Sequence, residues 1–167
     1  MWWGRRFKKI AGALADAARR LMSPGSDWRF RRALVRVLDV LSESCAAEMA
    51  AQLPALASVV VAASRDPHPR VAHAAAHCLG HWAIELRSTA ARVQSRPEVL
   101  RALLGCLGSG NLERVRAAAA FAVVNYAHAS YCAREELGDV DALLNALGGV
   151  IVECGSTTVC AGRRVRA

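Results

Sequence analysis

The stretch DPHPRVAHAA, residues 66–75, decides the fold, because its pattern returns elsewhere in the chain. It recurs as NLERVRAAA at residues 111–119, and a weaker copy, DWRFRR, stands at residues 27–32. The copies are 39 and 44 residues apart, counted between their arginines Arg31, Arg70 and Arg114. A period of about 40–47 residues is long enough for two helices in each repeat. The sequence therefore predicts a repetitive helical architecture.

Each copy begins with a residue that can open a helix. Asp27, Asp66 and Asn111 have side chains that can accept hydrogen bonds from the free backbone N–H groups of a first helical turn. Pro67 would then occupy the first helical position, where its missing N–H group costs nothing. Apolar residues follow at helical spacing in all three copies: Phe30, Leu34, Leu38 and Leu41; Val71, Ala75, Cys78, Leu79 and Trp82; and Val115, Ala119, Ala122 and Tyr126. These stripes predict three helices that each bury one face.

Partner helices fit between the three copies. Pro54 is expected to kink or interrupt the first of them, because proline removes an intrahelical hydrogen bond and clashes with the preceding turn. Ser95 and Glu98 have the spacing of a capping box, which would open the second. The predicted helices in chain order are residues 6–22, 28–44, 46–64, 67–86, 96–107, 111–128 and 138–151. The last of them is expected to leave Val140, Leu143, Leu144, Leu147, Val150 and Ile151 uncovered.

The fold class predicted from this pattern is all-α, a HEAT/armadillo-like α-solenoid of about 3.5 two-helix repeats. The chain holds 34 alanines, which favour helices and allow them to pack closely, and no segment alternates as a half-buried strand would. The solenoid is expected to fill residues 1–151, with repeats at about 6–44, 46–86 and 96–128 and a half repeat at 138–151. Residues 152–167 are expected to form an irregular tail.

The net charge of +8 comes from one end of the chain. Residues 1–36 hold 10 basic and 2 acidic residues, a balance of +8, and the remaining charges cancel. A basic chain invites a nucleic-acid hypothesis, but a local excess fits a first repeat helix with a solvated basic face better, so we expect no nucleic-acid partner. A mitochondrial presequence is the alternative for this basic end. No apolar run of about 18 residues predicts a transmembrane helix.

Motifs for catalysis or cofactor binding are absent from the sequence. It has no glycine-rich phosphate loop, HExxH or GxSxG, and its six cysteines form no CxxC pair, so we expect buried reduced thiols and no enzyme or cofactor. His73, His77 and His81 have a spacing that can chelate a metal. No acid or cysteine is expected to complete that set, since Cys78 lies on the core side of the helix, and we therefore expect no metal.

The three repeat copies resemble the importin-β (karyopherin-β) superfamily, and in particular its beta-3 branch. The similar blocks are DWRFR through Cys45, DPHPRV with Gly80, and Asn111 through Asn125, in the same order and at nearly the same spacing. The resemblance implies a nuclear transport receptor found in cytoplasm and nucleus, whose partners are protein cargo, Phe-Gly nucleoporins and the GTPase Ran. Since such receptors contain about twenty repeats, we expect this chain to be a fragment or a degenerate copy, without Ran binding of its own. The alternative function is a generic HEAT scaffold, such as a tubulin-binding array.

In such a solenoid the second helix of each repeat lines the concave face. The candidate partner-binding residues are therefore those of these helices that lie off the apolar stripe. We expect Asp39 and Glu43 to be exposed beside them. Asn125 is expected either to bond an extended peptide backbone or to be a helix-internal side chain satisfied by water. The candidates are Arg32, Arg36, His73, His77, His81, Phe121 and Asn125.

Overall fold

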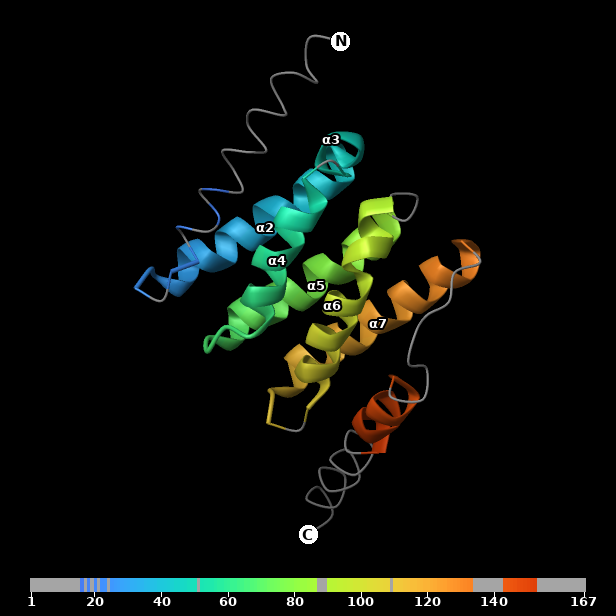
Figure 1. Cartoon of the computed structure of the whole chain (residues 1–167). Coiled ribbons are helices and arrows are strands. Elements are labelled where there is room, and N and C mark those ends of the chain that lie inside the picture. Colours follow the sequence, from blue (N-terminus) through green and yellow to red (C-terminus); the bar gives the residue numbers. More distant parts are fainter. Residues whose placement is uncertain are drawn as a thin grey trace.

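The computed structural model describes residues 16, 18, 20, 22–23, 25–50, 52–86, 90–108, 110–133 and 143–152, and these contain helices and no strands. The all-α prediction is confirmed. The helices are α2 (Trp28–Ser44), α3 (Ala46–Ala50), α4 (Leu53–Ser64), α5 (Pro69–Glu85), α6 (Ala90–Leu107) and α7 (Glu113–Ala133), followed by helical residues 143–152 (Figure 1). The predicted helix at 6–22 and the tail at 152–167 lie almost wholly outside the described residues.

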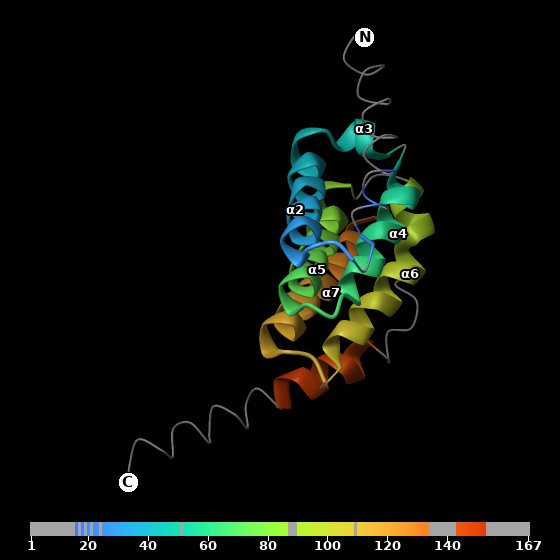
Figure 2. The ribbon, with the colours of Figure 1, turned by 90° about the vertical axis from the view of Figure 1, so that its left-hand side faces the viewer.

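The helices form two layers. One layer consists of α2, α5 and α7, with α5 packed between the other two, and the second contains α4 and α6 side by side (Figure 2). Each member of the second layer packs on the following member of the first, α4 on α5 and α6 on α7. Successive helical hairpins stacked in this way are the arrangement of an α-solenoid, as the repeat predicted.

The core confirms the predicted stripes of the second and third copies. All the apolar stripe residues of α5 and α7 are buried, and Leu53, Leu56 and Val60 of α4 complete the contact between the layers. The prediction of the buried stripe of α2 is only partly right. Phe30 is 64% exposed, and Arg31 is buried in its place. The reason is an ion pair between Arg31 and Asp66, which turns position 31 inward.

The start of α2 matches the prediction, whereas that of α5 does not. Asp27 caps α2, since its Oδ1 accepts a hydrogen bond from Arg29 N at 2.8 Å. Helix α5 is capped by His68, so Pro69 rather than Pro67 occupies its first position. Asp66 stands two residues before the capping position, and it is instead held by Arg31 and by the backbone N–H of His68, which lies 2.8 Å from its Oδ1.

The predicted starts of α6 and α7 are also corrected. Helix α6 begins at Ala90 and runs through Ser95, with Pro97 inside it, so the Ser–Glu spacing there does not open a helix. Helix α7 begins at Glu113 after Leu112, and the Asn111 amide donates to Gly105 O at 3.0 Å, closing the turn after α6. The interruption expected at Pro54 is confirmed, because the helix predicted at residues 46–64 is divided into α3 and α4. Pro54 lies in the first turn of α4.

The last described helix covers more of its apolar face than predicted. Leu143 and Val150 are buried in the main core, and Leu147 packs against it, whereas Leu144 and Ile151 are exposed. The helix at 143–152 thus buries one face on the solenoid and leaves the other open, as an amphipathic helix does. Val140 lies outside the described residues.

Gly80 marks the closest approach of α5 to α7. A Cβ atom added there would lie 2.9 Å from Ala122 Cα and 3.0 Å from Ala122 Cβ, so the backbone of α7 would have to move. Overpacking of this kind costs about 1–3 kcal/mol, against a gain in helix propensity of up to about 1 kcal/mol. We expect Gly80→Ala to lower the free energy of unfolding in urea by about 1–2 kcal/mol.

Gly105 provides the matched control, because a Cβ there would meet nothing within 4 Å. Gly105→Ala in α6 is therefore expected to stabilise the protein. If both substitutions raised the free energy of unfolding equally, the close contact at Gly80 would not constrain the packing of α5 on α7.

Candidate partner-binding face

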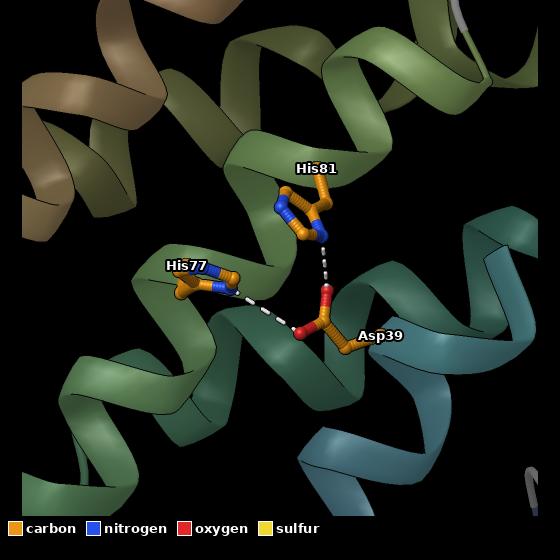
Figure 3. A group of neighbouring side chains, drawn as sticks. All are labelled: Asp39, His77 and His81. Atoms are coloured by element: carbon orange, nitrogen blue, oxygen red, sulfur yellow. Dashed lines mark hydrogen bonds and ion pairs between the residues drawn. The ribbon is translucent and has the colours of Figure 1, made fainter. Parts of the chain in front are cut away.

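The layer of α2, α5 and α7 presents most of the predicted binding residues on one side. We call this side the α2–α5–α7 face. Its exposed or half-buried candidates are Arg32, Arg36, His73, His77, His81 and Phe121. The polar ones fall into two groups, a basic pocket and a cluster around Asp39. Figure 3 shows Asp39, His77 and His81 of the second group.

The basic pocket lies near the beginnings of the three helices. It has a volume of about 210 Å³ and is lined by Arg32 of α2, Arg70 and His73 of α5, and Arg114 of α7. No carboxylate lines it, and no ion pair involves these three arginines among the residues that the structure describes. Since helix N-termini carry partial positive charge, the helix starts add to the potential of the side chains. The arrangement can bind an anionic group.

The surroundings of His73 in the pocket lower its pKa. Burial lowers the pKa of His73 below its ordinary value, and the charges of His77, Arg114, Arg32 and Arg36 lower it further. The burial disfavours any charge at this place, whereas the neighbouring positive charges favour an anion.

Arg70 is held at the rim of the pocket by aromatic contacts. The ring of Trp28 stacks on that of His68, with centroids 4.0 Å apart and an interplanar angle of 3°. The guanidinium carbon of Arg70 lies 5.3 Å from the centroid of the Trp28 ring, within the range of a cation–π contact. Sequence reasoning used Arg70 and Arg114 only to mark the repeat, although their equivalent places in two copies could have indicated a shared surface.

The second group surrounds Asp39, which contradicts two expectations. Asp39 is only 2% exposed, although we expected it on the surface, and it supplies the acid that seemed to be lacking near the histidines. Its Oδ2 lies 2.8 Å from Arg36 Nη1 and 3.2 Å from His77 Nδ1, and its Oδ1 lies 3.0 Å from His81 Nδ1. The packing of α2 against α5 brings these side chains together, and no local sequence pattern connects residue 39 with residues 77 and 81.

Asn125 was expected on this face, but it is buried and has an internal partner. Its side-chain amide donates to Gly80 O at 3.2 Å. Because α7 approaches α5 so closely at Gly80, the amide is enclosed between the helices and stabilises their contact. Phe121, one turn earlier on α7, is exposed.

The described cysteines are free thiols, and their surroundings differ. Cys78 and Cys106 are buried, as expected, and burial raises the pKa of both. Cys45 is half-buried, whereas Cys132 is exposed, with its Sγ 3.7 Å from His128 Nε2. In the part of the chain that the structure describes, no helix has the length and apolar character to cross a membrane.

The comparisons with known proteins agree with this architecture. Residues 28–82, which contain α2 to α5, match the model of a HEAT-like repeat. Importin subunit beta-3 of Saccharomyces cerevisiae is 30% identical over 105 residues, a match that covers 63% of this chain. The chain contains HEAT-like repeats and resembles a segment of an importin-β protein. It spans only 10% of the length of the yeast importin subunit, and no solved structure gives a significant match to it.

Proposed function

We propose that this importin-β-like segment is a non-catalytic protein-binding module that works in transport between cytoplasm and nucleus. Its partner would be a cargo protein or a nucleoporin, bound on the α2–α5–α7 face. The likeness to the yeast importin subunit and the repeat architecture support this class of function. Extended surfaces of solenoids of this kind are the usual place where partners bind.

The basic pocket carries the more specific part of the proposal. Arg32, Arg70 and Arg114 come from three successive helices of one layer and converge with His73 on the same small cavity. Arginine binds carboxylates through two parallel N–H donors, so a pocket of this composition suits aspartate or glutamate side chains. The partner segment is therefore an acidic one, and Phe121 supplies an exposed apolar contact on the same face.

This proposal is tested by the fluorescence anisotropy of a labelled peptide rich in glutamate and aspartate. Because a hydrogen bond to a charged group contributes about 1.5–3 kcal/mol, Arg70→Glu or Arg114→Glu is expected to weaken binding by more than tenfold. The affinity should also fall as salt concentration rises, because exposed charges are screened.

Arg101→Glu is the matched control. Arg101 is an exposed arginine on α6, in the other layer, so this variant has the same change of net charge without altering the pocket. An equal loss of peptide affinity in Arg101→Glu would show that the net charge of the protein, and not the basic pocket, determines the binding. Preferential binding of a basic peptide of the same length would contradict the proposal.

A further inference from the structure

A set of metal-ligand side chains joins two adjacent repeats beside the basic pocket. Asp39 and Glu43 stand four residues apart on α2, and His77 and His81 stand four residues apart on α5. Residues at this spacing lie on one face of a helix, so two such pairs on packed helices point four potential ligands at one another. Figure 3 shows both imidazoles directed at the two oxygens of the Asp39 carboxylate.

Two atoms in this set are buried and lack a hydrogen bond. They are Asp39 Oδ1 and His81 Nδ1, which face each other at 3.0 Å without the geometry of a hydrogen bond. Buried polar atoms are nearly always satisfied, so a pair left in this state requires an explanation. The other oxygen, Oδ2, is already occupied by Arg36 Nη1 at 2.8 Å and by His77 Nδ1 at 3.2 Å.

The distances fit a small divalent ion. Zinc binds imidazole nitrogen and carboxylate oxygen at about 2.0–2.2 Å in a tetrahedral arrangement, which separates neighbouring ligand atoms by about 3.3 Å. The separation of 3.0 Å between Asp39 Oδ1 and His81 Nδ1 is close to that value, and His77 Nδ1 lies 3.2 Å from Oδ2 of the same carboxylate. The three ligand atoms all lie within 4.8 Å of one another.

We propose that Asp39, His77 and His81 bind a zinc ion, with water as the fourth ligand. The ion would lie between Asp39 Oδ1 and the two Nδ1 atoms and satisfy both unpartnered atoms. Arg36 holds the other carboxylate oxygen and orients the carboxylate, as partners of metal ligands commonly do. Because the ligands come from α2 and α5, the zinc would join one repeat to the next. Its role is structural, and it does not depend on the proposed partner.

An acid–base alternative accounts for the same contacts without a metal. In it, a protonated His81 forms an ion pair with Asp39 Oδ1. The geometry favours zinc over this alternative. In an ion pair the imidazolium would donate from Nδ1 to Asp39 Oδ1, and these two atoms lack the geometry of a hydrogen bond although they lie 3.0 Å apart.

The experiment is a titration of the chelator-treated full chain with zinc, followed by calorimetry and by thermal unfolding. All proteins in the series carry Cys132→Ser, which removes an exposed thiol close to His128 that could bind zinc on its own. We expect one zinc ion per chain and a rise in melting temperature. Cobalt used in place of zinc should give the visible spectrum of a tetrahedral nitrogen and oxygen site, without a thiolate band.

The variants His77→Ala and His81→Ala are expected to lose at least tenfold in zinc affinity. His73→Ala is the matched control, because His73 lies on the same row of α5 and outside the ligand set, and it should bind zinc normally. Circular dichroism checks that each variant remains helical. Zinc uptake that is unchanged in His77→Ala and His81→Ala, a thiolate band with cobalt, or equal loss in His73→Ala would each overturn the proposal.

Discussion

Replacing Asp66 with alanine is expected to lower the free energy of unfolding by about 3–5 kcal/mol, because it leaves a charge unpaired inside the protein. Asp66 and Arg31 are connected by two hydrogen bonds, Nε to Oδ2 at 2.6 Å and Nη2 to Oδ1 at 3.0 Å. Only 9% of the Arg31 side chain and 5% of the Asp66 side chain are exposed. Arg31 also donates to the backbone oxygen of Ser26, so the pair ties the start of α2 to the turn before α5.

The same variant should lose part of the pH dependence of stability. Burial would raise the pKa of Asp66, but the hydrogen bonds from Arg31 and from His68 N outweigh it and hold the pKa below its ordinary value of 3.8. A carboxylate with a lowered pKa stabilises the fold above its unfolded pKa, and this contribution disappears as the pH falls through the folded value. Urea denaturation at pH 7 and at about pH 3 should therefore show a larger difference for the wild type than for Asp66→Ala.

Two controls identify the cause of the loss. Arg29→Ala breaks the exposed contact between Arg29 and Asp27, which should change stability little because exposed ion pairs contribute little. The double variant Arg31→Met with Asp66→Leu removes both charges and fills the space with apolar side chains, so it should recover much of the stability. A double variant as unstable as Asp66→Ala would show that the unpaired charge is not the cause.

The helices that could be predicted from the sequence are those whose packing follows from a single periodic stripe. In α5 and α7 every residue of the stripe is buried, because both helices present one apolar side to the core. In α2 the stripe fails at Phe30, because the ion pair of Arg31 with a residue 35 positions away decides which side faces inward. Local spacing holds no information about that partner.

The three repeat arginines show the same limit. Arg31, Arg70 and Arg114 occupy equivalent places in the sequence, yet Arg31 is buried and the other two line the basic pocket. The difference lies in the following copy, where Asp66 can pair with Arg31 but the corresponding residue, Asn111, is uncharged. Arg70 therefore lacks a buried carboxylate and stays at the surface, against Trp28. Equivalent sequence positions need not be equivalent in function.

The histidine row was predictable, whereas its surroundings were not. The spacing of His77 and His81 places them on one face of a helix whatever that helix packs on. Asp39 reaches them only because α2 and α5 are neighbours, which is a consequence of stacking one repeat on the next. A search for metal ligands within a single helix therefore misses a site that is shared between two repeats.

Replacing Trp82 with alanine is expected to lower the free energy of unfolding by about 3–5 kcal/mol, as for other large core residues. Trp82 is among the largest fully buried side chains described, and its Nε1 donates to Leu38 O of α2 at 3.4 Å. Thermal or urea denaturation measures the loss. Trp82→Phe is the control, because it keeps an aromatic ring in the core and removes the hydrogen bond, and it should lose less than the alanine variant.

The same substitution should also affect the proposed zinc site, through the spacing of α2 and α5. Leu38, which accepts the hydrogen bond from Trp82, directly precedes Asp39, and Trp82 directly follows His81. A cavity at position 82 therefore lies beside two of the proposed ligands and lets the helices move relative to each other. We expect Trp82→Ala to bind zinc more weakly than Trp82→Phe, in the same calorimetric titration. Equal zinc affinity in a Trp82→Ala protein that is still helical but destabilised would mean that the packing at Trp82 does not set the distance between Asp39 and His81.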